Sequence, residues 1–335
     1  MERTAVTDFS GTIAGIRLDM GRIEEQFAKV IVGNRDVLHS ILKALFSNGH
    51  VLLEGAPGLG KTLMVRTMAR ILDLKFRRTQ FTPDLMPADI IGTNIIVEDE
   101  EGRRHFRFEE GPVFTQVLLA DEINRASPKT QSALLQAMEE HEATVFGTTY
   151  PLDTVFITLA TQNPIEMAGT YPLPEAQLDR FFCKVVIGYP DQESLKEIAR
   201  RNTGQSPGTV VEPVLSRERI LEIREALAHI PITDRIYDFA VFLVRATHPG
   251  AEGATEMVRR LVRYGASPRG VNALLSASRV SAVMDGRVNI SLEDLEENYL
   301  PTLRHRLVMR FEGEVEGVGP ETVLRDLFGT VRSRF

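Results

Sequence analysis

The sequence predicts an α/β fold with a mostly parallel sheet flanked by helices, followed by a smaller all-helical domain. Up to about residue 190, short apolar runs alternate with amphipathic helical patterns, as in parallel strands joined by helices. A connection rich in Gly, Pro and Ser follows at 202–213, and the later patterns are helical. We expect a partly disordered N-terminal lead-in (1–30), an α/β core (31–190), a helical domain (191–310) and a C-terminal tail (311–335).

Each strand of the core is predicted from a run of apolar residues. The four runs are "HVLLEG", "FTQVLLADE", "TVFITLATQN" and "CKVVIGY". Such continuous apolar character is typical of strands that are buried on both faces. Two further segments, "NIIVEDEEGRRHFRFEEG" and "ATVFGTTYPL", indicate hairpins that turn near Gly102 and Gly147, although both could instead be edges of the main sheet.

Helices are predicted from apolar residues at helical spacing, as over 61–72, and from residues that cap a first turn. The expected N-caps are Ser127, Asp234, Ser267 and Ser291. Proline follows Ser127 and Ser267 at the first helical position, where its missing N–H is tolerated. Asp294, three residues after Ser291, completes a pattern that resembles a capping box.

The composition is that of an ordinary globular protein, with 43% hydrophobic and 25% charged residues. The 39 basic and 46 acidic residues give a net charge of −7, which argues against broad binding to nucleic acid or anionic lipid. We expect no signal peptide and no membrane span, because no apolar run has the required length. Cys183 is the single cysteine, so we expect a buried thiol in a reducing cytoplasm.

A glycine-rich stretch, "GAPGLGKTL", matches the pattern G-x-x-x-x-G-K-[ST] between a predicted strand and a predicted helix. Glycines let backbone N–H groups close around phosphate oxygens, and the helix N-terminus adds a positive dipole. We expect ATP as the ligand, with Lys61 bridging its β- and γ-phosphates and Thr62 binding Mg²⁺. The residues expected to bind the nucleotide are Gly55, Ala56, Pro57, Gly58, Leu59, Gly60, Lys61, Thr62 and Leu63.

Two adjacent acids end the strand-like run "VLLADE". Asp121 can hold Mg²⁺ through its waters, and Glu122 is placed to activate the attacking water as a general base. The alternative is that both are solvated acids. Asn163 ends the next strand, where its amide could orient the water, although a residue before proline is commonly a turn residue. Arg180 follows Asp179, with which it could form a local ion pair at the surface.

These motifs, in this order and at this spacing, resemble the MoxR family of AAA+ ATPases. The resemblance covers about residues 30–310 and rests mainly on "QFTPDLMPADIIGT", "DEINRASPKTQSALLQAMEE", "ATQNP", "YPLPEAQLDRF" and "SPRG". It implies a P-loop NTPase (AAA+) core and a helical lid domain, with ATP bound between them. It also implies a ring of identical subunits, often a hexamer, in which a neighbour completes each site.

The resemblance also implies residue roles. Asn163 matches sensor 1, and Arg180 matches the arginine finger that reaches the γ-phosphate held by the next subunit. Arg269, in "SPRG", matches sensor 2 and is expected to contact the phosphates of its own subunit; Gly270 after it should weaken that helix slightly. Val32 and Gly33 are expected near the adenine. The two hairpins match a helix-2 insert and a pre-sensor-1 hairpin, which face the ring's centre or its client.

By resemblance, the chain would couple ATP hydrolysis to chaperone-like remodelling, maturation or assembly of protein complexes, with partners that include von Willebrand factor A domains. A nucleic-acid motor is an alternative, but the net charge and the lack of an attached nucleic-acid-binding module count against it. A binding switch with little turnover is another. Lys61, Glu122, Asn163 and Arg180, the expected catalytic set, argue for real turnover.

Overall fold

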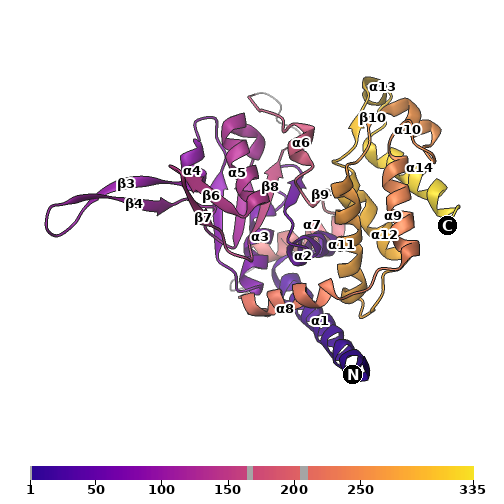
Figure 1. The fold of residues 1–335 in the computed structure, drawn as a ribbon, viewed down its shortest axis with the longest axis horizontal. Coiled ribbons are helices and arrows are strands. Elements are labelled where there is room, and N and C mark those ends of the chain that lie inside the picture. The colour runs from indigo at the N-terminus through magenta and orange to yellow at the C-terminus, as the bar shows by residue number, and fades with distance from the viewer. Residues whose placement is uncertain (1, 164–168, 204–209) are drawn as a thin grey trace.

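A computed structural model describes residues 2–163, 169–203 and 210–335 of the chain (Figure 1). Its centre is a five-stranded parallel sheet with the strand order β2-β5-β8-β1-β9. The strands are β1 (Val51–Glu54), β2 (Phe76–Gln80), β5 (Val117–Asp121), β8 (Ile157–Gln162) and β9 (Cys183–Val186). The sequence predicted four of them. Strand β2 escaped prediction because it is an edge strand, and its sequence "FRRTQ" has no apolar run.

Helices cover both faces of this sheet. The helices of the core are α2 (Arg35–Phe46), α3 (Lys61–Ile71), α4 (Pro87–Ile91), the 3-10 turn η1 (Ile123–Arg125), α5 (Pro128–Glu140) and α6 (Glu175–Leu178). Alternate side chains of a strand point to opposite faces, so Val51 and Leu53 of β1 pack with α2 and α3. Leu52 instead joins the cluster that contains α4 and α5. The sheet is therefore buried on both sides, as its continuous apolar runs indicated.

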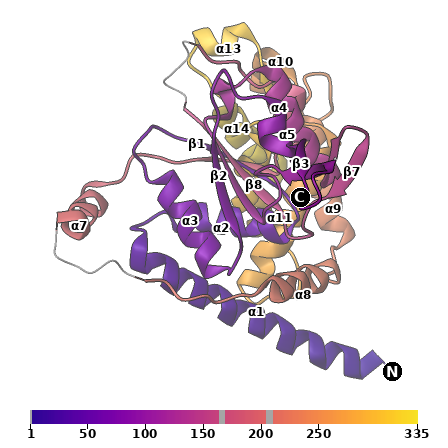
Figure 2. The ribbon, with the colours of Figure 1, turned by 90° about the vertical axis from the view of Figure 1, so that its left-hand side faces the viewer.

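The N-terminal region differs from the expected lead-in. Residues Glu2–Val30 form one long helix, α1, whose N-terminal end projects from the body of the molecule (Figure 2). Its buried side chains are Ile13, Ile16, Met20, Ile23 and Phe27, at helical spacing. They pack into the same apolar cluster as α2 and α3. Polar and charged residues separate these side chains along the sequence, so no continuous apolar run predicted the helix.

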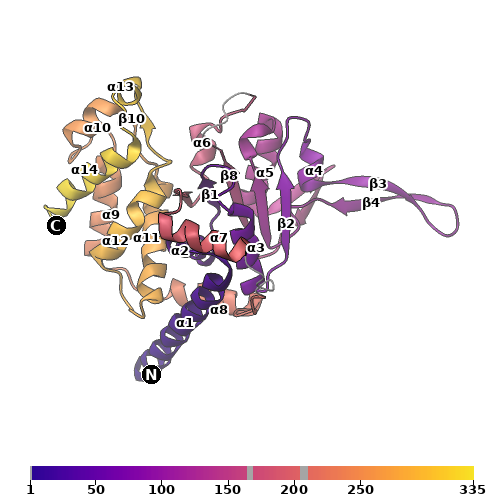
Figure 3. The ribbon, with the colours of Figure 1, turned by 180° about the vertical axis from the view of Figure 1, so that it is seen from behind.

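The C-terminal half is mainly helical, and its elements from residue 234 onward lie together on one side of the core (Figure 3). Its elements are α7 (Gln192–Thr203), α8 (Arg217–Ala228), α9 (Asp234–Ala246), α10 (Glu256–Leu261), β10 (Val262–Tyr264), α11 (Pro268–Met284), α12 (Leu292–Leu303), β11 (Val308–Met309), α13 (Phe311–Val315) and α14 (Pro320–Arg332). Ser267 and Ser291 cap α11 and α12 as expected. The cap of α9 is Thr233, one residue before the expected Asp234. The predicted fold class is confirmed, with a short β10–β11 ladder added.

Two boundaries of the helical half differ from the sequence-based division. Helix α8 packs through Ile220, Ile223 and Leu227 into the cluster that contains α1 and α2 together with part of α11, rather than into the main cluster of the helical domain. Helix α14, in the expected tail, packs through Leu324 and Leu327 into the cluster of the helical domain. Part of the Gly/Pro/Ser-rich connection, residues 204–209, lies outside the described residues.

Both hairpins form as two-stranded sheets of their own. The first pairs β3 (Gly92–Glu98) with β4 (Arg104–Glu110) and extends away from the core (Figure 1). The second pairs β6 (Glu142–Val145) with β7 (Thr148–Pro151). Cross-strand partners Ile96 and Phe106 of the first hairpin are 64% and 73% exposed. Phe108 stacks on Tyr150 with ring centroids 3.9 Å apart, which links the two hairpins at their bases.

Among the described residues, no helix is both long and apolar enough to cross a membrane. Cys183 lies in β9 and is buried, as expected, and burial raises the pKa of its thiol to about 12. The thiol is therefore neutral near pH 7 and fills space in the core.

Candidate functional site

The glycine-rich loop joins β1 to α3 and opens toward a cavity. Gly58 and Gly60 have φ angles of 83° and 77°, a region that favours glycine. Gly60 is the N-cap of α3 and provides no side-chain cap, so the first amides of the helix keep their donors for a ligand. Lys61 donates through Nζ to the carbonyls of Gly55 (2.7 Å) and Ala56 (2.9 Å). Burial lowers the pKa of Lys61, and the nearby carboxylates of Asp121 and Glu122 oppose that shift.

Asp121 ends β5 and is held by two neighbouring strands. Its Oδ1 accepts a hydrogen bond from Thr161 Oγ1 of β8 at 2.6 Å. Its Oδ2 accepts from Arg78 of β2, from Nε at 3.1 Å and from Nη2 at 2.8 Å. Arg78 therefore supplies a positive charge beside Asp121 and fixes the orientation of its carboxylate. Asp121 and Thr62 line the same cavity, and a carboxylate together with a hydroxyl is a set of oxygen donors that suits Mg²⁺ shared with phosphates.

Glu122 follows in a left-handed conformation, with φ 56° and ψ 50°. Few residues other than glycine adopt this region, and such strain is commonly found at functional sites. Its backbone N–H donates to Thr161 Oγ1 at 2.8 Å. Its side-chain Oε2 accepts from Gln80 Nε2 at 2.7 Å and from Arg125 Nη1 at 2.9 Å. Gln80 and Arg125 thus hold the carboxylate in place through one of its two oxygens, Oε2.

One cavity of about 440 Å³ collects these groups. It is lined by the loop residues Pro57, Gly58, Leu59, Gly60, Lys61, Thr62 and Leu63 together with Arg78, Gln80, Asp121, Glu122, Thr161, Gln162 and Asn163. Because β1, β5 and β8 are adjacent and parallel, their carboxyl ends meet at one edge, where ligands of open α/β sheets bind. The residues of this cavity that the sequence did not predict are Arg78, Gln80, Thr161 and Gln162.

An apolar cavity of about 280 Å³ adjoins the phosphate cavity and shares Gly58, Leu59, Gly60 and Leu63 with it. Val32 lines it, and Gly33 follows with a φ of 69°. Its other lining residues are Val30, Ile31, Asn34, Met64, Tyr189, Pro190, Leu195, Ile198 and Arg201. A flat apolar base fits such surroundings beside a phosphate loop.

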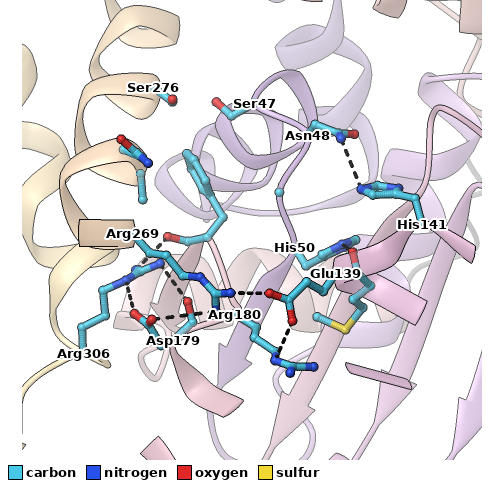
Figure 4. A pocket seen from close by; sticks show the side chains of 15 residues that line it. Ser47, Asn48, His50, Glu139, His141, Asp179, Arg180, Arg269, Ser276 and Arg306 are labelled. Atoms are coloured by element: carbon cyan, nitrogen blue, oxygen red, sulfur yellow. Dashed lines mark hydrogen bonds and ion pairs between the residues drawn. The ribbon is translucent and has the colours of Figure 1, made fainter. Parts of the chain in front are cut away.

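Arg180 and Arg269 do not line the phosphate cavity; they share a separate one of about 280 Å³ between the core and the helical domain (Figure 4). Both pair with Glu139 of α5: Arg180 Nε lies 3.0 Å from Oε2, and Arg269 Nη2 contacts Oε1. The local Asp179–Arg180 pair that the sequence allowed does not form. Asp179 instead accepts from Arg306 Nε at 3.0 Å and from Ser267 Oγ at 2.9 Å.

Arg306 lines this cavity and connects the helical domain to the core. Its side chain is 2% exposed and donates to the backbone carbonyls of Phe181 and Phe182 as well as to Asp179. Burial lowers the pKa of Arg306 to about 10, so the guanidinium stays charged near pH 7. The packing also explains why residue 270 is glycine. A Cβ at Gly270 would lie 2.9 Å from Leu303 Cδ2. The glycine that should weaken α11 thus permits its close packing.

Comparisons with known proteins agree with this geometry. Residues 50–183 match the family described as ATPase family associated with various cellular activities (AAA), and residues 254–327 match the AAA lid domain. "Chaperone MoxR1" of Mycobacterium tuberculosis is 40% identical over 324 residues, which cover 96% of this chain and 85% of that protein. "Protein MoxR" of Methylorubrum extorquens is 33% identical, covering 92% and 94%.

The chain belongs to the MoxR family of AAA+ ATPases. A solved crystal structure from Cytophaga hutchinsonii, 38% identical, superposes with a TM-score of 0.89 and covers 98% of each chain. This MoxR chain therefore shares its whole architecture with that protein, including the helical half.

Proposed function

We propose that this MoxR-family chain hydrolyses Mg-ATP within a ring of identical subunits, most simply a hexamer, and uses the energy for chaperone-like remodelling or assembly of protein complexes. The observation that supports it most is the single cavity that brings together Lys61, Thr62, Asp121, Glu122 and Asn163. These are the groups that phosphoryl transfer to water requires. A relative named as a chaperone supports the use of the energy on proteins.

Each residue of the site has its own proposed role in binding or hydrolysing ATP. The first amides of α3 and the ammonium of Lys61 bind the β- and γ-phosphates. Thr62 and Asp121 hold Mg²⁺, which neutralises phosphate charge when it is bound. Glu122 accepts the proton of the attacking water, and Gln80 and Arg125 orient its carboxylate through Oε2. The amide of Asn163 orients that water, and the apolar cavity with Val32 receives the adenine.

Arg180 and Arg269 act on the site of a neighbouring subunit. Both lie outside the phosphate cavity of their own chain, so we revise the expected role of Arg269 in its own subunit to a role in the next one. Two guanidinium groups can neutralise the charge that spreads over the transferring phosphoryl group. An arginine supplied in this way accelerates other nucleotide hydrolases by about 10³–10⁵-fold. Hydrolysis would then depend on assembly.

The hairpins are the surfaces that we assign to clients. Ile96 and Phe106 lie side by side on the first hairpin, and Phe146 at the turn of the second is 81% exposed. Large apolar side chains exposed in this number mark interaction surfaces. We expect the clients or partners to be proteins, including ones with a von Willebrand factor A domain.

The experiment uses Glu122→Gln protein as bait in a lysate of the native host, with and without ATP. The substitution keeps the shape of the site and removes the general base, so ATP should stay bound without being hydrolysed. Lys61→Ala, which weakens ATP binding, is the matched control. Protein partners that are captured only with ATP and only by Glu122→Gln support the proposal. Capture of nucleic acid alone, with ATPase activity stimulated by DNA, would contradict it.

A further inference from the structure

Glu139 lies where the two halves of the molecule meet. It is near the C-terminal end of α5 in the core, and its two carboxylate oxygens contact different arginines (Figure 4). Arg180 follows α6 in the core, whereas Arg269 belongs to the first turn of α11 in the helical domain. One carboxylate therefore bridges two cations that come from separate domains and face the same cavity.

Without a shared anion, the two guanidinium groups would repel each other. Asp179, the other carboxylate in this cavity, is occupied by Arg306 and Ser267, and its oxygen lies 3.9 Å from Arg269. Glu139 is 38% exposed, and ion pairs of such exposure contribute little to stability because solvent screens them. The bridge therefore matters more for where the arginines lie than for how stable the fold is.

The backbone that carries Glu139 is firmly anchored. His50 Nε2 donates to the carbonyl of Met138 at 2.9 Å, and His50 Nδ1 accepts from the amide of Thr158 in β8 at 3.0 Å. The helix then ends at His141, which has a φ of 52°. These contacts tie the end of α5 to the central sheet, so Glu139 projects from a fixed point.

The contacts leave donors free for a ligand. Arg180 uses its Nε on Glu139, so in the described part of the chain both of its Nη groups can still donate to an anion. Arg269 contacts Glu139 through one Nη and keeps its Nε for another acceptor. A phosphate oxygen of a neighbouring subunit could thus accept from both arginines while Glu139 keeps them together.

We propose that Glu139 is a positioning residue, which holds Arg180 and Arg269 at a common spacing so that both reach the same γ-phosphate of the adjacent subunit. This inference rests on the proposed role of the two arginines. Charge on the transferring phosphoryl group is redistributed in the transition state, so loss of the spacing lowers kcat more than it raises KM. A displacement of about 1 Å in such a group costs up to about 100-fold in rate.

The test compares Glu139→Gln with Glu140→Gln in the full chain. Glu140 is the next residue of α5, is exposed, and pairs with Gln136 rather than with an arginine, so its substitution removes the same charge from the same helix end. Steady-state ATPase assays should give a kcat about 10- to 100-fold lower for Glu139→Gln, with KM for ATP within about 2-fold of the wild type. Glu140→Gln should leave both parameters unchanged. Melting temperatures and sedimentation should match across the three proteins.

A coupled substitution separates positioning from other roles. In the Arg269→Ala background, one of the two arginines is gone, so Glu139→Gln should lower kcat less than it does in the wild type. Equal losses in both backgrounds would overturn the inference, as would a kcat that rises, or a Glu139→Gln protein that fails to assemble. If Arg180→Ala and Arg269→Ala keep full kcat, the proposed role of the arginines fails. If they lose kcat and Glu139→Gln does not, the positioning role alone fails.

Discussion

Acidification from pH 7 to pH 4 should destabilise the folded chain through His50. The imidazole is buried between β8 and the end of α5, where it donates to the carbonyl of Met138 and accepts from the amide of Thr158. Burial lowers the pKa of His50 from 6.5 to about 4, against the opposing effect of the Met138 hydrogen bond. The positive charge of Arg224 disfavours the protonated ring further.

The sign and size follow from linkage between proton binding and folding. The unfolded chain binds a proton at this histidine below pH 6.5, whereas the folded chain binds it only near pH 4. The contribution of the neutral ring to stability is therefore fully present above pH 6.5 and is lost as the pH falls toward 4. A pKa difference of this size corresponds to about 3 kcal/mol of unfolding free energy.

Urea unfolding at pH 7 and pH 4 of the wild type and of His50→Asn measures this contribution. At pH 7 the variant should be less stable than the wild type, because the Thr158 amide loses its imidazole acceptor. Only the pH-dependent difference matters, since the other titrating groups are common to both proteins. The wild type should lose about 3 kcal/mol more than the variant between the two pH values. Equal losses would refute the reasoning that His50 is held neutral by burial.

Three further substitutions have definite expected outcomes. Glu122→Gln should lower kcat by about 10²–10⁴-fold in a phosphate-release assay while equilibrium binding of ATP persists; simultaneous loss of binding would contradict the role of a general base. Asp179→Asn removes the carboxylate partner of buried Arg306 and should cost about 3–5 kcal/mol in urea titrations, and a cost below about 1 kcal/mol would show that the pair is dispensable. Phe106→Ser should change stability by less than about 0.5 kcal/mol and leave ATPase activity intact, but reduce client capture in the Glu122→Gln protein; undiminished capture would remove the hairpin from the client surface.

The sequence predicted the parts of the site that lie in continuous motifs. Lys61, Thr62, Asp121 and Glu122 follow apolar strands, and adjacent parallel strands bring their ends together. Arg78 could not be placed, because β2 has an exposed, charged edge and gives no apolar signal. Contacts of Asp121 and Glu122 with that strand depend on pairing that local pattern does not encode.

The cavity that Arg180 and Arg269 share could not be predicted either, because it is formed by segments that are far apart in the sequence. The resemblance identified Arg180 and Arg269 and assigned them to the phosphates of different subunits, so it did not predict that the two side chains line one cavity. Their common partner, Glu139, is brought to them by the packing of the helical domain against the core, and no spacing in the sequence indicates that contact. The long helix α1 could have been predicted, because its apolar residues recur at helical spacing. Polar residues between them interrupt the apolar character of the segment.

Mixing two inactive proteins tests the shared site most directly. Lys61→Ala lacks ATP binding but keeps Arg180, whereas Arg180→Ala keeps its phosphate cavity intact. Each should be nearly inactive alone. If the arginine of one subunit serves the ATP of the next, co-assembly of the two proteins should restore ATPase activity well above the sum of the separate activities. No recovery from a mixture that sedimentation shows to be co-assembled would contradict a site completed by the neighbouring subunit.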